Sequence, residues 1–105
     1  MAFENRGQDF ESRYVHDQEL RFRIEARRNK LLGLWAAQKL GYSGDDASRY
    51  AQDLINVAFQ TPGDDGIFQK IRADFDGAKV EQSDHQIQRH MSEFLAEAET
   101  QLRND

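Results

Sequence analysis

The sequence predicts an all-α protein: a four-helix bundle with a flexible, partly disordered N-terminal arm. Apolar residues recur at intervals of three and four in four separate segments, which is the pattern of amphipathic helices. Clusters of glycine, serine and proline interrupt this pattern between the segments. No segment alternates apolar and polar residues over a useful length, so we predict no strands. With 105 residues, 38% of them hydrophobic, the chain is long enough for one domain with a real core.

The first forty residues contain two apolar stripes on one proline-free segment. The stripe predicted to face the core consists of Leu20, Ile24, Leu31 and Trp35. The second stripe consists of Phe3, Phe10 and Tyr14. At about 100° per residue, the two stripes are offset by roughly 70° around a helix. The second stripe has no obvious packing partner in its own chain, so residues 1–18 are predicted to form an arm that binds another molecule.

A short turn separates the first helix from the second. Gly41 is predicted to end the first helix, because glycine often follows the last helical residue. Ser43 is predicted to cap the second helix, with Asp46 completing an acidic variant of the capping box. The apolar face of this helix consists of Ala47, Tyr50, Ala51, Leu54, Ile55 and Ala58. The turn at 61–66, which holds the only proline, ends it.

Two further helices complete the predicted bundle over residues 19–105. The third is short, ends at Gly77 and carries Ile67, Phe68, Ile71 and Phe75. Ser83 and Gln86 predict a capping box at the start of the fourth helix. Its apolar face consists of Ile87, Met91, Phe94, Leu95, Ala98 and Leu102. Short connections favour mostly antiparallel neighbours, and disorder is expected in residues 1 to about 15 and in the last few.

Two residues of the first helix are predicted to have packing roles. Gly33 lies in mid-helix, where it costs about 1 kcal/mol relative to alanine. Such a glycine usually permits close approach of another backbone, either of a neighbouring helix or of a partner. Trp35 is the single tryptophan, and we expect it to anchor the core.

Composition excludes several classes of protein. The chain has no cysteine, which rules out disulfides and thiolate metal sites and fits a reducing compartment. A formal net charge of −5 argues against general nucleic-acid binding. No stretch resembles a leader peptide or a membrane span. We therefore expect a cytoplasmic protein that does not insert into the membrane.

The titratable residues show no pattern typical of a catalytic or metal site. His85 and His90 are five residues apart, whereas a helical ligand pair needs a spacing of three or four, and no Glu-x-x-His occurs. Both are interpreted as surface or capping histidines. His16 lies in a charged stretch and could titrate near neutral pH. We expect neither catalysis nor a cofactor or metal ion.

Several motifs together resemble a known family. The first reads ARRNKLLGLWAA over residues 26–37, and the segment that leads to it reads FESRYVHDQEL over 10–20. Lys39-Leu40-Gly41, the acidic turn at Asp64-Asp65 and the segment RADFD at 72–76 continue the match. The chain resembles, over essentially its whole length, the zeta subunit family of alphaproteobacterial ATP synthases, which is a family of ATPase inhibitors.

The resemblance implies a four-helix bundle and a function that composition does not provide. Zeta subunits bind the catalytic head of the rotary ATP synthase, peripheral to the membrane. Their N-terminal segment enters an interface between the alpha and beta subunits, near the gamma shaft, and blocks rotation in the hydrolysis direction. Carried over by position, the residues expected to contact the partner are Phe3, Glu4, Phe10, Glu11, Arg13, Tyr14, His16 and Asp17.

The basic stretch at residues 21–30 leaves an alternative open. Such a stretch is most often a solvated helix face that pairs with acids on neighbouring helices. The alternative is a nucleotide-sensing bundle, in which Arg27, Arg28 and Lys30 contact the phosphates of ATP or ADP weakly. Weak nucleotide binding would suit a regulator of an ATP-driven machine.

Overall fold

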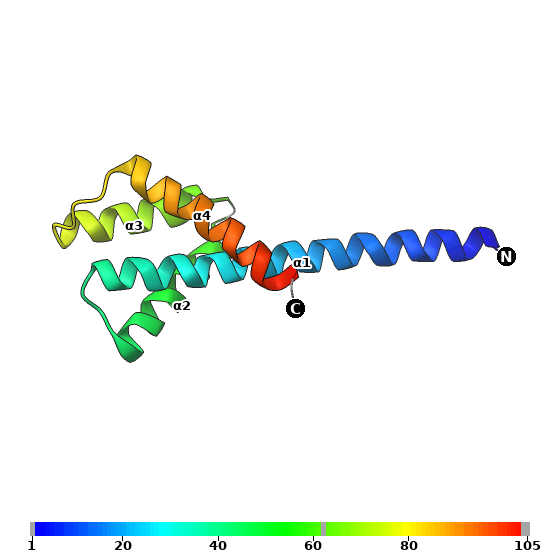
Figure 1. Cartoon of the computed structure of the whole chain (residues 1–105), viewed down its shortest axis with the longest axis horizontal. Helices are drawn as coiled ribbons and strands as arrows, with labels where there is room; N and C mark the ends of the chain where they lie inside the picture. Colours follow the sequence, from blue (N-terminus) through cyan, green and yellow to red (C-terminus); the bar gives the residue numbers. More distant parts are fainter. Residues whose placement is uncertain (1, 62, 104–105) are drawn as a thin grey trace.

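The computed structural model describes residues 2–61 and 63–103, with side chains from residue 17 onward. It contains four helices: α1 (Ala2–Lys39), α2 (Gly44–Gln60), α3 (Asp65–Gly77) and α4 (Asp84–Arg103) (Figure 1). The described ranges contain no strand. The all-α, four-helix prediction is therefore confirmed. Disorder was predicted for residues 1 to about 15 and for the last few residues. Residues 1, 104 and 105 and the side chains up to residue 16 lie outside the described part of the chain, so this stays a prediction.

The long helix α1 determines the shape of the molecule. Its second half packs mainly against α2 and α4, while α3 joins those two helices to each other. Its first half projects away from the other three helices (Figure 1). At 1.5 Å per residue, 38 helical residues span about 57 Å, which accounts for most of the 64 Å long axis. The arrangement is a compact bundle that carries a helical extension.

Each helix contributes apolar side chains to one core. The core cluster consists of Leu32, Ala36, Ala37, Tyr50, Leu54, Ile67, Ile71, Phe75, Ile87 and Met91. The predicted apolar faces of α2 and α3 are confirmed in their central residues. On α4, Leu95 was expected to be buried but is 37% exposed, because it lies at the edge of the α1–α4 contact.

The predicted core stripe of α1 needs a correction. Of its members only Ile24 is buried, whereas Leu20, Leu31 and Trp35 are half-buried. The deepest residues of α1 lie on an adjacent face, at Leu32, Ala36 and Ala37. A helix that packs against neighbours on two sides buries a surface wider than one stripe, and small side chains let those neighbours approach most closely.

Gly33 fills the role predicted for it, and the backbone that approaches is that of a neighbouring helix. A Cβ atom at position 33 would lie 2.6 Å from the Cα of Ala51 in α2. Real Cβ atoms essentially never come so close to a backbone atom. The glycine therefore sets the distance between α1 and α2.

Trp35 and His90 form a second contact between helices. The indole stacks on the imidazole of His90 in α4, with ring centroids 4.1 Å apart, and meets the edge of Phe75 at 5.6 Å. The Nδ1 of His90 donates to the carbonyl of Gln86 at 2.8 Å. His90 is thus a packing residue rather than a surface histidine, because its flat ring covers the half-exposed face of the indole.

The helix ends follow sequence signals with two exceptions. Gly41, at φ 87°, ends α1 in a Schellman motif in which the Tyr42 amide donates to the Ala37 carbonyl at 2.9 Å. Ser43 occupies the N-cap position of α2, but its side chain makes no capping bond. After α3 the left-handed position is held by Lys79, at φ 58°, instead of a glycine.

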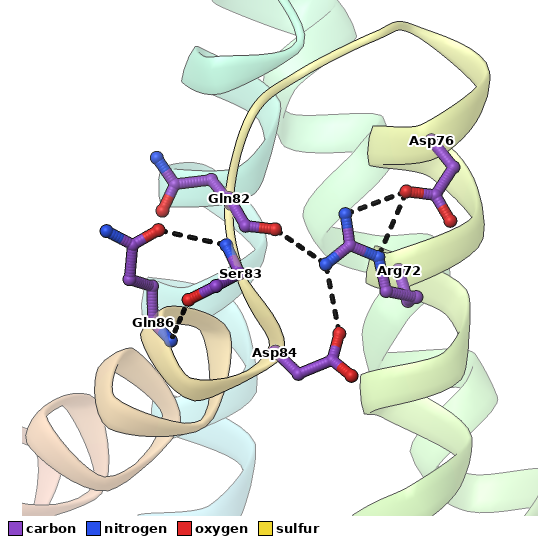
Figure 2. A network of polar contacts seen from close by, with 6 residues as sticks. All are labelled: Arg72, Asp76, Gln82, Ser83, Asp84 and Gln86. Atoms are coloured by element: carbon purple, nitrogen blue, oxygen red, sulfur yellow. Dashed lines mark hydrogen bonds and ion pairs between the residues drawn. The ribbon is translucent and has the colours of Figure 1, made fainter.

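The connection from α3 to α4 is held by side chains at both ends. The Ser83 hydroxyl accepts from the Gln86 amide at 3.1 Å, and the Gln86 side chain accepts from the Ser83 amide at 2.9 Å, so the predicted capping box is confirmed (Figure 2). Arg72 of α3 donates to Asp76, to the Gln82 carbonyl and to Asp84 (Figure 2). The hydrogen bonds to Asp76 and Asp84 raise the pKa of the Arg72 guanidinium, which stays charged and fixes the connector against α3.

Candidate partner-binding surface

The predicted arm and the bundle share one uninterrupted helix. The backbone of α1 runs from Ala2 to Lys39 without a break, so arm residues keep a constant angular register with the packed residues. The first buried side chain of α1 in the described range is Ile24. We call residues 17–25, which overlap the end of the arm and include Ile24, the base of the arm.

Most predicted contact residues lie where only the backbone is described. Phe3, Glu4, Phe10, Glu11, Arg13, Tyr14 and His16 belong to α1, and their side chains lie outside the described residues. Asp17 is described and exposed. It lines a groove of about 740 Å³ between the base of the arm and the last turns of α4, together with Leu20, Arg21 and Leu95. The roles of the predicted contact residues in binding stay predictions.

The three basic residues of the alternative interpretation are not brought together. Arg28 is buried, and its guanidinium donates to Asp64 at 2.6 Å and to Asn29 at 2.7 Å. Arg27 donates instead to Gln101 of α4 at 2.9 Å, and Lys30 is exposed. Nucleotide contact at these positions stays a prediction, and the Arg28 guanidinium already donates to two protein acceptors.

The Arg28–Asp64 ion pair shows how the basic stretch is used. The arginine side chain is 4% exposed and the aspartate side chain 63%, so the pair joins the interior of α1 to the N-cap residue of α3. The stretch was expected to be a solvated face. Arg28 does pair with an acid outside its own helix, but its side chain is buried rather than solvated.

Two exposed aromatic residues were not identified by the sequence patterns. Phe22 and Phe59 are 54% and 66% exposed, and their ring centroids lie 5.5 Å apart. Neither belongs to an apolar stripe read from spacing. A large apolar residue outside every stripe is the signal that could have identified them.

A buried tyrosine links α2 to α3 away from the arm. The Tyr50 hydroxyl donates to Asp74 at 2.8 Å, and the Lys70 ammonium lies 5.0 Å from the centre of the Tyr50 ring. Burial, together with the hydrogen bond to Asp74, raises the pKa of Tyr50 well above its ordinary value. The phenol therefore stays neutral, as a structural tie rather than an acid or base.

The described part of the chain offers no metal site and no membrane span. No group of three or more histidine, cysteine or acidic side chains in this part is arranged to hold a metal ion. Among the same residues, no helix combines the length and the apolar character that crossing a bilayer requires.

Comparisons with known proteins decide the family. A family model described as ATPase inhibitor subunit zeta matches residues 1–101. The chain belongs to this family. No curated protein matches the chain. Among solved structures, a protein determined by solution NMR is similar, with 35% identity over 81% of this chain and 96% of that chain, at a TM-score of 0.71.

Membership of the zeta family assigns the chain to the ATPase inhibitor subunits, and this fits the expectation that it is not an enzyme. Several residues of the motifs that resemble the zeta family have a structural role in this chain. Arg28, Gly33 and Ala36 hold α1 against its neighbours, and Phe75 fills the core. The family match also includes the projecting half of α1, and none of the side chains described there, from residue 17 on, belongs to the core cluster.

Proposed function

We propose that the chain inhibits the rotary ATP synthase by inserting its arm, residues 1–18, into the catalytic head. The arm enters an interface between an alpha and a beta subunit, near the gamma shaft, and prevents rotation in the hydrolysis direction. One observation supports this above the others: half of a 38-residue helix projects from the bundle, within a chain that matches an ATPase inhibitor family from residue 1.

The continuity of α1 lowers the cost of forming the arm helix. Starting a helix is unfavourable, whereas extending an existing one adds a hydrogen bond for each residue ordered. The bundle holds the second half of α1 in helical form through α2 and α4. The arm therefore extends a helix that already exists, and less of its binding energy is lost to ordering.

The contact energy is assigned to the apolar stripe of the arm. Positions 3, 10 and 14 lie along one side of a helix, and burying each aromatic ring contributes about 1.5–3 kcal/mol. Charged residues beside the stripe would fix the register against charges on the motor. These are Glu4, Glu11, Arg13 and Asp17, whereas His16 lies about 140° from the stripe. The block requires no chemical step, only a wedge that rotation must expel.

ATP hydrolysis by the cognate catalytic head, measured with increasing amounts of the full chain, tests the proposal. The wild-type chain should lower the rate in a dose-dependent way, and deleting residues 1–14 should abolish that effect. The double variant Phe10→Ala, Tyr14→Ala should raise the half-inhibitory concentration at least about tenfold, since tenfold corresponds to only 1.4 kcal/mol.

The matched control changes the opposite side of the arm. Gln8→Ala together with Ser12→Ala alters two positions roughly 140–180° away from Phe3 around the helix. This control should inhibit like the wild type. Full inhibition by the chain that lacks residues 1–14 would refute the arm mechanism, and flat activity over a wide dose range would refute inhibition itself.

A further inference from the structure

The second half of α4 lies along α1 and follows it toward the arm. The rings of Trp35 in α1 and Phe94 in α4 have centroids 6.5 Å apart. Eight residues before Trp35, the Arg27 guanidinium donates to the side chain of Gln101 at 2.9 Å. Between these two contacts α4 advances by seven residues in the opposite direction. The two helices therefore stay paired, antiparallel, as α1 approaches the arm.

This pairing ends at the base of the arm. The last residue of α4 is Arg103, only two residues beyond Gln101. The groove of about 740 Å³ at this point is lined by Leu20 and Ile24 of α1 and by Leu95 and Arg103 of α4. Leu20 is the first half-buried side chain of α1 in the described range. Beyond it, α1 projects past the end of α4 (Figure 1).

The helix α2 also touches this part of α1, but its contacts stop closer to the bundle. Its outermost contact is the ring pair of Phe59 with Phe22, whose centroids lie 5.5 Å apart. The groove beside that pair is lined on α1 by residues from Phe22 to Asn29. The groove beside α4 reaches Asp17, five residues further toward the N-terminus. Of the two helices, α4 therefore accompanies α1 further toward the arm.

The last supported turn of α1 affects how far the helix continues. A segment without tertiary contacts stays helical only through its own propensity and through the turn that it extends. Isolated helices shorter than about 12–15 residues are marginal in water even for alanine-rich sequences. The arm is little longer than this and contains Gly7, a weak helix former. Its helical form therefore depends on the turn at its base, which packs beside α4.

We infer that the α4 end, residues 95–103, is a positioning element for the arm: by holding the base of the arm helical, it raises the fraction of chains whose arm is ready to bind. The inference rests on the proposed function, in which the arm binds as a helix. The apparent affinity of such a chain is reduced in proportion to the fraction that is competent. Leu95 and Gln101 thus act on inhibition through the arm, without touching the motor.

The test replaces the α4 side of this contact in the full-length chain. Leu95→Ala with Gln101→Ala removes a side chain that lines the groove and the hydrogen bond to Arg27, while alanine keeps α4 a good helix former. The control, Glu93→Ala with Thr100→Ala, changes two exposed residues of the same helix. Both variants leave every residue of the arm unchanged.

Nuclear magnetic resonance on the free chains measures the helicity of the arm. The secondary chemical shifts of the Cα carbons of residues 8–16 report on the arm, and those of residues 30–37 report on the bundle. The Leu95, Gln101 variant should lose about half of the helical shift in the arm and none in the bundle, because only the support at the base is removed. The control should lose neither. Unchanged arm shifts in the variant would refute the inference.

The hydrolysis assay measures the consequence for inhibition. Halving the helical fraction of the arm should raise the half-inhibitory concentration about twofold, and the control should inhibit like the wild type. A rise without any change in the arm shifts would mean that the α4 end contacts the catalytic head directly, which would also overturn the inference. If the double variant does not fold, Gln101→Ala alone, which removes only the hydrogen bond to Arg27, makes the same comparison.

A rescue experiment separates action through the arm from any other effect. Gln8→Ala with Ser12→Ala raises helix propensity on the side of the arm away from the stripe. Combined with the Leu95, Gln101 variant, this pair should restore part of the arm shifts and of the inhibition. In the wild-type chain it should change little, because fewer arms remain to be ordered. Equal effects in both backgrounds would show that the two sites are independent and would contradict the inference.

The outcomes also separate the two proposals. If the arm shifts fall in the Leu95, Gln101 variant but the wild-type chain does not inhibit hydrolysis, the α4 end holds the arm and the proposed function fails. If the wild-type chain inhibits and the arm shifts do not respond, the proposed function stands and the role of α4 is refuted.

Discussion

At the scale of single residues, the family motif is explained mostly by packing. Gly33 is required because the Ala51 backbone occupies the space that a side chain would need. Arg28 is required because a guanidinium reaches both Asn29 and Asp64 from the interior of α1. A motif that looks charged and functional in the sequence therefore acts in the structure as a set of contacts between helices.

Replacing Gly33 with alanine should destabilise the bundle, although alanine is the better helix former. The gain in helix propensity is about 1 kcal/mol, but the new Cβ would overlap the Ala51 backbone, and overpacking typically costs about 1–3 kcal/mol. Urea unfolding followed by circular dichroism measures the net effect. Gly77→Ala, where a Cβ meets nothing within 4 Å, is the control and should not destabilise. A Gly33→Ala variant as stable as the control would contradict the close contact.

At the scale of elements, each helix is defined by its ends and by its links to a neighbour. Two serines occupy N-cap positions, yet only Ser83 makes the reciprocal bonds with a residue three positions later. The links between elements are similarly specific. Arg28 reaches the start of α3, and Tyr50 of α2 reaches Asp74 in α3.

The two caps should differ when truncated. Ser83→Ala removes an observed capping bond, and we expect a loss of about 1 kcal/mol in the free energy of unfolding. Ser43→Ala removes a side chain that makes no such bond, and the loss should be only a few tenths of a kcal/mol. Chemical denaturation of both variants makes the comparison. Equal losses would mean that the hydroxyl of Ser43 does cap α2.

Tyr50 should make stability depend on alkaline pH. Its pKa in the folded chain is raised, chiefly by burial, whereas the unfolded chain ionises its tyrosines near pH 10. The unfolded state therefore holds fewer protons than the folded state above that pH, and stability falls as pH rises. Thermal midpoints measured from pH 8 to 11 should fall less steeply for Tyr50→Phe than for the wild type. Tyr42→Phe is the control and should follow the wild type. If the thermal midpoints of Tyr50→Phe run parallel to those of the wild type, Tyr50 is not the cause of the alkaline loss of stability.

At the scale of the whole molecule, stability and the proposed function belong to different parts of the chain. The core cluster draws its α1 members from Leu32 onward, and the first half of α1 projects beyond α2, α3 and α4 (Figure 1). A long extension attached to an independent core can be modified without unfolding the bundle. Its helical form, however, depends on the bundle that holds the rest of α1.

Deleting residues 1–14 should leave the bundle folded. No described core residue precedes Ile24, so the thermal midpoint should fall by less than about 4 °C, which is roughly 1 kcal/mol for a domain of this size. The helical signal in circular dichroism should decrease because part of α1 is missing. A drop of 10 °C or more would place the arm in the core and contradict the division of the chain at residue 18.

The sequence by itself determined the helices and the family. Periodicity, glycine and serine signals predicted four helices and the Ser83 cap, because these depend on local backbone chemistry. Tertiary structure decided which face of α1 lies deepest, the burial of Arg28 and the stacking of His90 on Trp35. It also decided that Phe22 and Phe59 lie exposed together. Spacing along one helix describes a single face, whereas burial depends on how many neighbours that helix has and how closely each approaches.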